Sequence, residues 1–435
     1  MGAMTVRNEI NVDGKSNWFK CLCAVFFVFA FYSQALYADT AQVFETYKDR
    51  IFQIRIVDNA SSAKASLGSG FAVGQDGLIM SNYHVIAQLV YKSDAFRAEY
   101  IDSKGETGPI DLVAIDVVHD LALLRIRDKK ITPLKFNTGE LANGEKIFSM
   151  GNPNDLGFTI VEGIYNGLIN AYLYDKIHFT GSINPGMSGG PTLASNGEII
   201  GVNVATAGNQ MSVVIPSRYA YDFLQRTLNS SAALDNDFKS VAGKQLLTHQ
   251  SDLLTRLMES SEESVELGHF VVPGKLTNFI NCWGNTLSWD SKPYQVVFKQ
   301  CASSDDVYLS ESHTSGLVMY SHQFVSGKEF GRLRFYRMLE GFFNEAYDDL
   351  VGTIEDVSSY SCHTDFVENN SVNLKAFFCV REYRHFPGVY DTVLRAVSLE
   401  HDNEGLVTTL ALSGVSLETA TEFNHYYLNH IKWKP

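Results

Sequence analysis

The sequence predicts an all-β first half, folded as a pair of barrels or a sandwich, and then a mixed, mostly antiparallel β domain with flanking helices. Between residues 51 and 215, short apolar runs alternate with turn signals, and helical periodicity is almost absent. Beyond residue 237, helical patterns flank further period-two runs. The chain therefore divides into two structural units.

The first half is expected to open with a short helix at 39–50 and to close with a helix at 217–228. Two hairpin signals, Gly74-Gln75-Asp76 and Asn196-Gly197, lie between pairs of strands. The expected strands are 51–57, 68–73, 77–81, 95–102, 110–116, 121–126, 146–150, 159–170, 176–180, 191–194, 198–205 and 211–215.

The second half begins after a polar segment at 229–237, where we place the domain junction. A helix is expected at 238–262, a strand at Val372–Val380 and a final helix at Leu417–Ile431, with Ser416 as its N-cap. The predicted division is a targeting segment at 1–38, a first domain at 39–230 and a second domain at 231–435.

Composition excludes some classes of function. The chain of 435 residues is 45% hydrophobic and 19% charged, as in a folded globular protein. Its net charge of −14 argues against nucleic acid or an anionic membrane as the main partner. Composition leaves the oligomeric state open.

The N-terminus has the pattern of a signal peptide. Basic residues precede an apolar run at Cys21–Tyr32, and small residues follow at Ala35 and Ala38. We expect cleavage and export to the periplasm or the medium. The alternative is a retained membrane anchor, and contact with the membrane is expected only in that case.

Four cysteines lie beyond this segment: Cys282, Cys301, Cys362 and Cys379. In an exported protein an even number of cysteines favours disulfides. The local pairing Cys282–Cys301 and Cys362–Cys379 is preferred because each pair brackets a plausible hairpin. Buried free thiols are the alternative. No zinc-binding spacing occurs, and we expect neither a metal nor an organic cofactor.

A candidate nucleophile lies in the glycine-rich segment Asn184–Pro191, which contains Ser188. A serine hydroxyl needs an adjacent base, an orienting carboxylate and backbone N–H donors for the developing oxyanion. Glycines allow backbone conformations in which such donors converge. An ordinary turn with a capping serine is the alternative interpretation.

Two residues could complete this site, His84 after a strand and Asp120 between two apolar runs. Each is also compatible with a purely structural role. Their order in the chain, His then Asp then Ser, is that of chymotrypsin-type proteases, whereas subtilisins and α/β-hydrolases have other orders and alternate strands with helices. The all-β pattern fits the first order alone.

The segments around these residues resemble trypsin-like serine proteases of the HtrA/Deg type. The resemblance covers residues 66–217, and it implies a chymotrypsin-like double barrel. The segments that carry it are GSGFAVGQDGLIMSNYHVI, DLALLRI, SMGNPNDLGFTIVEGIYN, TGSINPGMSGGPT, GEIIGVN and VVIPS, in the order typical of that family.

The resemblance implies that Ser188 attacks a peptide carbonyl, His84 transfers the proton and Asp120 orients the histidine. The backbone N–H groups of Gly186 and Ser188 would form the oxyanion hole. The expected function is an exported serine endopeptidase acting on proteins or peptides, in envelope protein processing or quality control.

The resemblance also places Ser182 at the base of a primary specificity pocket, and it places Val202, Asn203, Val204 and Val214 near the walls. None of these side chains is charged, so a small or medium apolar substrate residue is expected. The alternative is that the valines belong to the strand core.

Two features depart from the family pattern. Met187 replaces the usual asparagine, and it is expected to reshape the oxyanion hole or the leaving-group side. No PDZ-type carboxylate-binding loop follows residue 230. An alternative function is therefore a latent or inactive protease-fold protein that acts as a binding or chaperone-like module through its C-terminal domain.

Overall fold

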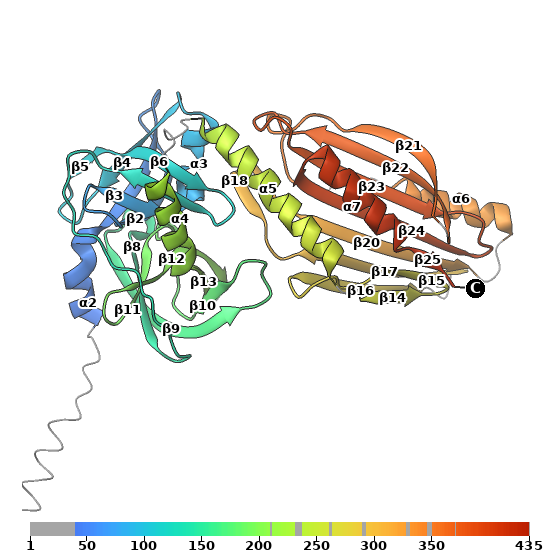
Figure 1. Ribbon diagram of the computed structural model, residues 1–435, viewed down its shortest axis with the longest axis horizontal. Helices are drawn as coiled ribbons and strands as arrows, with labels where there is room; N and C mark the ends of the chain where they lie inside the picture. The colour runs from blue at the N-terminus through green and yellow to red at the C-terminus, as the bar shows by residue number, and fades with distance from the viewer. Residues whose placement is uncertain are drawn as a thin grey trace, which may run out of the picture.

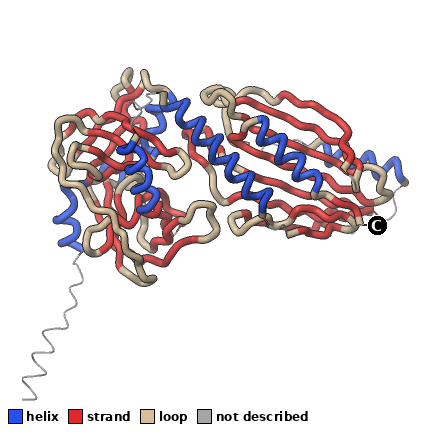
Figure 2. Tube along the Cα trace, viewed as in Figure 1, coloured by secondary structure: helices blue, strands red, loops and turns tan. Residues whose placement is uncertain are grey.

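The computed structural model describes residues 40–208, 211–230, 237–260, 263–288, 293–327, 331–345, 350–369 and 371–434. The predicted targeting segment 1–38 lies outside these residues. Two β-rich halves lie side by side, and helix α5 (Phe238–Glu259) begins beside the first half and runs over the second (Figure 1). Strands dominate both halves (Figure 2).

The first sheet contains all six strands expected up to residue 126, and β5 in addition. They are β1 (Ile51–Asp58), β2 (Lys64–Ala72), β3 (Leu78–Ser81), β4 (Phe96–Ile101), β5 (Thr107–Pro109), β6 (Asp111–Asp116) and β7 (Leu121–Arg125). Their order is β5-β4-β1-β2-β3-β7-β6, with all neighbours antiparallel. Helix α3 (Tyr83–Tyr91), which the sequence pattern did not predict, follows β3 directly.

The second sheet closes into a barrel with the order β10-β13-β12-β11-β8-β9. Its strands are β8 (Lys146–Gly151), β9 (Thr159–Ile169), β10 (Lys176–Phe179), β11 (Pro191–Ala194), β12 (Ile199–Gly208) and β13 (Met211–Pro216). Besides α3, the helical segments of this half are α2 (Thr40–Tyr47), η1 (Lys48–Arg50), η2 (Pro153–Asp155) and α4 (Ser217–Asn229). The predicted double-barrel class is confirmed, with hydrogen bonding that closes the second sheet and leaves the first open.

One apolar cluster joins the two sheets. Phe71 and Leu123 of the first sheet pack with Met150, Val202 and Ile215 of the barrel, and all five are fully buried. The site described below therefore rests on two sheets that share a core.

The C-terminal half is built on a seven-stranded antiparallel sheet with the order β16-β17-β20-β24-β23-β22-β21. Its strands are β16 (Ile280–Ser288), β17 (Tyr294–Ser303), β20 (Val318–Gly327), β21 (Ser361–Glu368), β22 (Asn373–Glu382), β23 (Tyr390–Ser398) and β24 (Glu404–Val415). Smaller elements are β14 (Ser264–Leu267), β15 (Phe270–Pro273), β18 (Val307–Ser310), β19 (His313–Ser315), α6 (Arg332–Phe343), α7 (Leu417–Asn429) and β25 (Lys432–Trp433).

Helices α5 and α7 cover one face of this sheet, and α6 packs on β23 and β24 with its own apolar cluster (Figure 1). The expected N-cap of α7 is present, because the Ser416 hydroxyl accepts the Thr419 N–H at 3.1 Å. The mixed β domain with flanking helices is thus confirmed.

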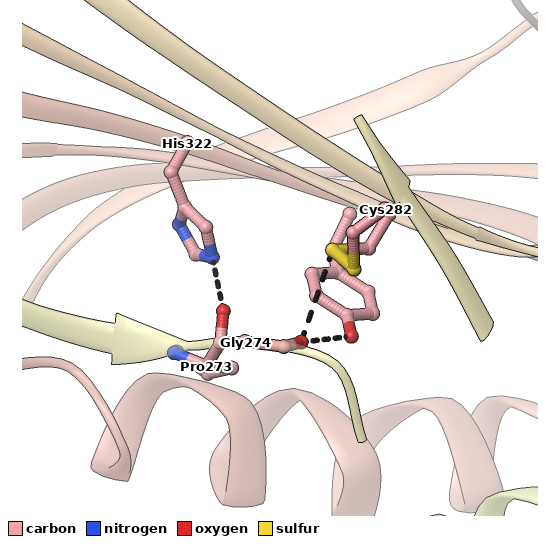
Figure 3. Close-up of a disulfide and its surroundings, with 6 residues drawn as sticks. Pro273, Gly274, Cys282 and His322 are labelled. Atoms are coloured by element: carbon pink, nitrogen blue, oxygen red, sulfur yellow. Dashed lines mark hydrogen bonds between the residues drawn. A yellow bond between two sulfur atoms is a disulfide. The ribbon is translucent and has the colours of Figure 1, made fainter. Parts of the chain in front are cut away.

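Disulfides connect Cys282 with Cys301 and Cys362 with Cys379, the pairing that the sequence favoured. Each bond joins residues directly opposite one another on adjacent strands. Beside the first disulfide, the buried His322 donates from Nε2 to the Pro273 carbonyl oxygen at 3.0 Å (Figure 3). These contacts fasten the end of β15 to the main sheet.

The two halves also share apolar core. The cluster that includes Ile54 and Tyr83 of the first half continues into Leu246 of α5, Leu309 of β18 and Phe386. All five side chains are buried. The C-terminal half therefore packs against the side of the first half that carries α3.

Candidate active site

His84 lies in the first turn of α3, where the helix leaves backbone N–H groups without intrahelical partners. Asp120 supplies an acceptor there. Its Oδ1 accepts the His84 N–H at 2.8 Å, and its Oδ2 lies 2.7 Å from His84 Nδ1. The positive end of the helix dipole favours a carboxylate at this position. One aspartate therefore fixes both the backbone and the ring of His84.

The turn that presents Asp120 is strained. Asp120 adopts a φ of 53°, in the left-handed region that few residues other than glycine enter. The Asn82 side chain donates to the Asp120 carbonyl oxygen at 2.7 Å, and Asn82 itself is fully buried. The turn between β6 and β7 is thus tied to the residue that precedes α3.

Burial lowers the pKa of His84, but the charge of Asp120 and its hydrogen bond outweigh that effect, and the pKa is raised. Because Asp120 is the acceptor, the proton of the neutral ring lies on Nδ1. Nε2 then carries the free lone pair. This is the tautomer that a general base needs.

Ser188 is half-buried, and its hydroxyl donates to the Val204 carbonyl oxygen at 2.7 Å. Val204 is the unpaired residue of a bulge in the β12–β13 pairing, between Asn203 and Ala205. Among the described residues, Ser188 and His84 form no hydrogen bond with each other. The Ser188 hydroxyl is therefore hydrogen-bonded to strand β12, and a rotation about χ1 of Ser188 is needed to turn it toward His84.

Hydrogen bonds fix the two carbonyl groups that directly precede Gly186 and Ser188 in this loop. The Pro185 carbonyl accepts the Asn154 N–H at 2.9 Å, and the Met187 carbonyl accepts the Gly190 N–H at 3.0 Å. Since C=O and N–H point in opposite directions across a trans peptide, the next N–H groups face the other side. These N–H groups belong to Gly186 and Ser188, and neither has a protein acceptor in the described part of the chain.

Glycine is required at two points of this loop. Gly186 has a φ of 94°, and a Cβ there would lie 2.5 Å from the Asn152 carbonyl oxygen. Gly189 has a φ of 82°, and a Cβ there would lie 2.3 Å from the Ser69 carbonyl oxygen. Ser69 also donates from its hydroxyl to the Gly186 carbonyl at 2.7 Å. Ser69 of the first sheet thus supports residues 184–190, which we call the oxyanion loop.

A second loop, η2, supports the oxyanion loop from the side. Asn154 and Asp155 have φ angles of 48° and 64°. Asp155 accepts a hydrogen bond from Gln53 at 2.9 Å and forms an ion pair with Lys64. The sequence alone gave Asp155 no role. The available signal was an aspartate where the family-type signature has glycine.

The predicted specificity residues differ in exposure. Ser182 is exposed, whereas Val202, Asn203 and Val214 are fully buried, and their place around a specificity pocket stays a prediction. Val202 packs in the apolar cluster between the two sheets, whereas Asn203 and Val214, which are paired across β12 and β13, lie on the opposite face of the strands. Val204 does line a cavity with His84 and Asp120.

Asn203 holds the loop that carries Ser188. Its amide donates to the carbonyl oxygens of Met150 at 3.0 Å and Met187 at 3.2 Å, and its oxygen accepts the Thr192 hydroxyl at 2.6 Å. Met187 itself is fully buried in the barrel core, so its side chain does not reshape the oxyanion hole or the leaving-group side. Both residues anchor the loop from within.

The C-terminal half reaches the catalytic pair. The ring of Tyr308, on β18, meets the His84 ring edge-on with centroids 5.9 Å apart. Both residues line a cavity of about 490 Å³ together with Asp120 and Val204. Sequence reasoning did not predict this contribution, because it joins segments more than 200 residues apart.

Within the described ranges, no group of His, Cys, Asp and Glu side chains is arranged to hold a metal ion. In the same residues, no helix is both long enough and apolar enough to cross a membrane.

Comparisons with known proteins agree with this geometry. Residues 68–202 match the family model of the trypsin-like peptidase domain. Mitochondrial serine protease HTRA2 of Bos taurus is 31% identical over 224 residues, covering 48% of this chain and 47% of that protein. The HTRA2 protein of Drosophila ananassae is 30% identical over 268 residues, covering 56% and 60%.

Serine protease HTRA1 of Xenopus tropicalis is 30% identical over 214 residues, covering 46% of this chain and 45% of that protein. The chain thus spans between 45% and 60% of the length of these relatives. A solved structure of the serine endoprotease from Yersinia pestis aligns with a TM-score of 0.39 at 25% identity, covering 44% of this chain and 67% of that one.

Proposed function

We propose that this chain, whose first half contains a trypsin-like peptidase domain of the HtrA type, is a serine endopeptidase that cleaves protein substrates. The observation that carries the proposal is the combination of an oriented His84–Asp120 pair with Ser188 in a loop where, among the described residues, the Gly186 and Ser188 N–H groups have no protein acceptor. Each element alone has structural explanations. Together they supply base, nucleophile and oxyanion donors.

The reaction follows from the positions of these groups. A bound substrate displaces the Ser188 hydroxyl from Val204, and Nε2 of His84 takes its proton as Oγ attacks the scissile carbonyl carbon. The Gly186 and Ser188 N–H groups stabilise the oxyanion. His84 then protonates the leaving amine, and an acyl-enzyme forms. A water molecule then attacks the acyl-enzyme in the same way and releases the carboxylic acid product.

The test is the Ser188→Ala variant. Casein hydrolysis should fall by about 10⁶-fold, since removal of a triad serine has an effect of that order in other serine proteases. A fluorophosphonate probe should label the unaltered protein and not this variant. Ser195→Ala is the matched control, because Ser195 is an exposed serine in the turn between β11 and β12, outside the predicted site, and it should keep both properties. Undiminished hydrolysis by Ser188→Ala would refute the proposal.

One observation favours a second candidate function. The Ser188 hydroxyl is bonded to Val204 and not to His84, as in a resting or latent site. The catalytic hydrogen bond between a serine and its histidine often becomes short only when substrate binds, so the observation is compatible with activity. If the purified protein resisted the fluorophosphonate both with and without added unfolded substrates, the latent binding or chaperone-like function would be supported instead.

We place this activity outside the cytoplasm, in envelope protein processing or quality control. The two disulfides support this location, because such bonds persist in oxidising compartments. Cell fractionation with an antibody against the C-terminal half would test it. Recovery in the cytoplasmic fraction, with all four cysteines alkylated before denaturant is added, would contradict it.

A further inference from the structure

The cavity beside the catalytic pair is shared by both halves of the molecule. His84, Asp120 and Val204 line it from the protease half, and Asp306 and Tyr308 line it from the C-terminal half. Val204 also holds the Ser188 hydroxyl. Any substrate residue next to the scissile bond on this side therefore meets a surface that the C-terminal half supplies.

This wall is fixed in place. The Leu173 N–H donates to the Asp305 carboxylate at 2.5 Å, and the Tyr83 hydroxyl donates to the Leu309 carbonyl at 3.3 Å. Val307 and Leu309 are buried in the cluster that joins the two halves. The cavity is therefore preformed, as small-molecule and side-chain sites usually are.

The lining has a definite chemistry. Three carboxylates, of Asp120, Asp305 and Asp306, face one ammonium group, that of Lys176. Asp120 is engaged with His84, and Asp305 accepts backbone N–H groups. Asp306 keeps part of its side chain open to a ligand, while partial burial raises the pKa of its carboxyl and the charge of Lys176 opposes this shift. A cation placed beside Asp306 would replace the missing water.

The remaining surface suits a long apolar stem. Val118 and Val213 offer aliphatic contacts, and the rings of Tyr172 and Tyr308 can face a cation. Lysine and arginine combine such a stem with a terminal charge. An acidic side chain would instead meet like charges in a partly desolvated space.

We propose that this cavity is a subsite for a lysine or arginine side chain close to the scissile bond, with Asp306 of the C-terminal half as its specificity-determining residue. The inference deepens the proposed endopeptidase function and rests on it. It assigns the C-terminal half a role in substrate choice.

The experiment uses the full chain and a library of internally quenched peptides varied at the four positions on each side of the bond. The unaltered protein should favour Lys or Arg over Glu at one such position. Asp306→Asn should reduce that preference about tenfold in kcat/KM, and Asp306→Lys should shift it toward Glu. Asp365→Asn, at an exposed carboxylate on the edge strand β21, is the matched control and should change nothing.

The outcomes separate the two proposals. Hydrolysis that depends on Ser188 but shows no basic preference, or a preference that Asp306→Lys leaves intact, overturns the subsite while the endopeptidase stands. A complete lack of Ser188-dependent hydrolysis overturns both. A preference that follows the charge at residue 306 supports the subsite, because a merely structural role of Asp306 would lower kcat/KM equally for all peptides.

Discussion

Asp155 holds a backbone conformation that aspartate seldom adopts, and its side-chain contacts compensate for it. Its φ is 64°, at the position where the family-type signature has glycine. Gln53 and Lys64 hold its carboxylate, and the preceding residue, Asn154, donates to the Pro185 carbonyl. That carbonyl fixes the direction of the adjoining N–H in the oxyanion loop. We infer that Asp155 is a positioning residue.

Replacing Asp155 with glycine separates the two effects of this residue. Glycine adopts positive φ without cost, so Asp155→Gly should keep or slightly raise Tm. The carboxylate contacts are lost, so kcat should fall about tenfold with little change in KM, a fraction of the 10²–10³ that follows loss of one oxyanion donor. Steady-state kinetics and thermal unfolding measure both.

The partner variant Lys64→Met should have the same effect on kcat, and the double variant should add little to either single change. Asp76→Asn is the control, since it breaks another exposed ion pair of the same half, with Arg125. A lowered Tm with unchanged kcat in Asp155→Gly would leave the residue a purely structural role.

The residues that carry chemistry could be predicted, whereas the pocket could not. His84, Asp120 and Ser188 lie in segments whose order and glycine content limit the alternatives. The placement of Val202 and Val214 at a pocket stays a prediction, because the face to which a strand residue points depends on register. Here a bulge at Val204 shifts that register, and no residue type in the sequence signals it.

At the scale of elements, β22 and β23 carry a buried ion pair across the sheet. Arg381 and Asp391 are opposite one another, with Arg381 Nε 2.8 Å from Asp391 Oδ2. The Tyr383 hydroxyl donates to the same carboxylate, and Arg381 donates to the Leu350 carbonyl at 2.9 Å. Burial raises the pKa of Asp391, although Arg381 opposes this. Every charge of the pair is thus satisfied.

Removing one partner should cost much more than removing both. Arg381→Met leaves a buried carboxylate without its cation, and the free energy of unfolding should fall by about 3–5 kcal/mol. The double variant with Asp391→Leu removes both charges and should recover most of that loss. Urea denaturation followed by intrinsic fluorescence would measure the difference. Equal losses in the single and double variants would contradict this account.

The strands of the first half were predictable because short apolar runs alternate there with turn signals. In the C-terminal half, the sequence predicted one strand and two helices, because strands such as β23 and β24 are buried along almost their whole length and show no alternation. The cysteines lie at facing positions of two hairpins. Helix α3 was missed for a physical reason. Six of its nine residues are buried, so it lacks the polar face that reveals a helix in sequence. Tertiary burial on both sides hides its period.

For the whole molecule, the sequence predicted two units but not how they meet. Apolar residues of α3 and α5 indicate buried surface, yet the pattern is the same whether the partner surface lies within one half or in the other. The structure joins the halves through one cluster and through polar contacts such as Gln245, whose side chain bonds the backbone of Ile115 and Val117. Domain packing is therefore a long-range property.

Three buried histidines lie within or against the C-terminal half. His249 contacts Tyr174, His313 contacts Tyr91, and His322 binds the Pro273 carbonyl. Burial lowers the pKa of His249 and of His313 to about 4, and that of His322 to about 3. All three are neutral in the folded protein at pH 6, and two of them lie where the halves meet.

Acid should therefore destabilise the molecule well above the pH at which carboxylates titrate. The unfolded chain takes up protons on these histidines near pH 6.5, whereas the folded chain does so only near pH 3–4, so stability is lost as pH falls below about 6.5. Each histidine contributes a slope of up to about 1.4 kcal/mol per pH unit. The pKa of His84 is raised, so its protonation favours the folded state and offsets the effect of one buried histidine.

Urea unfolding at pH 7.5, 6.5 and 5.5 measures this dependence. The urea midpoint should fall as the pH is lowered. His322→Gln should lower stability at pH 7.5 and should reduce by about one the number of protons taken up on unfolding, which makes the pH dependence less steep. His363→Gln is the control, since His363 is exposed on β21 and should not alter the slope. A midpoint independent of pH in this range would show that the buried histidines do not couple protonation to unfolding.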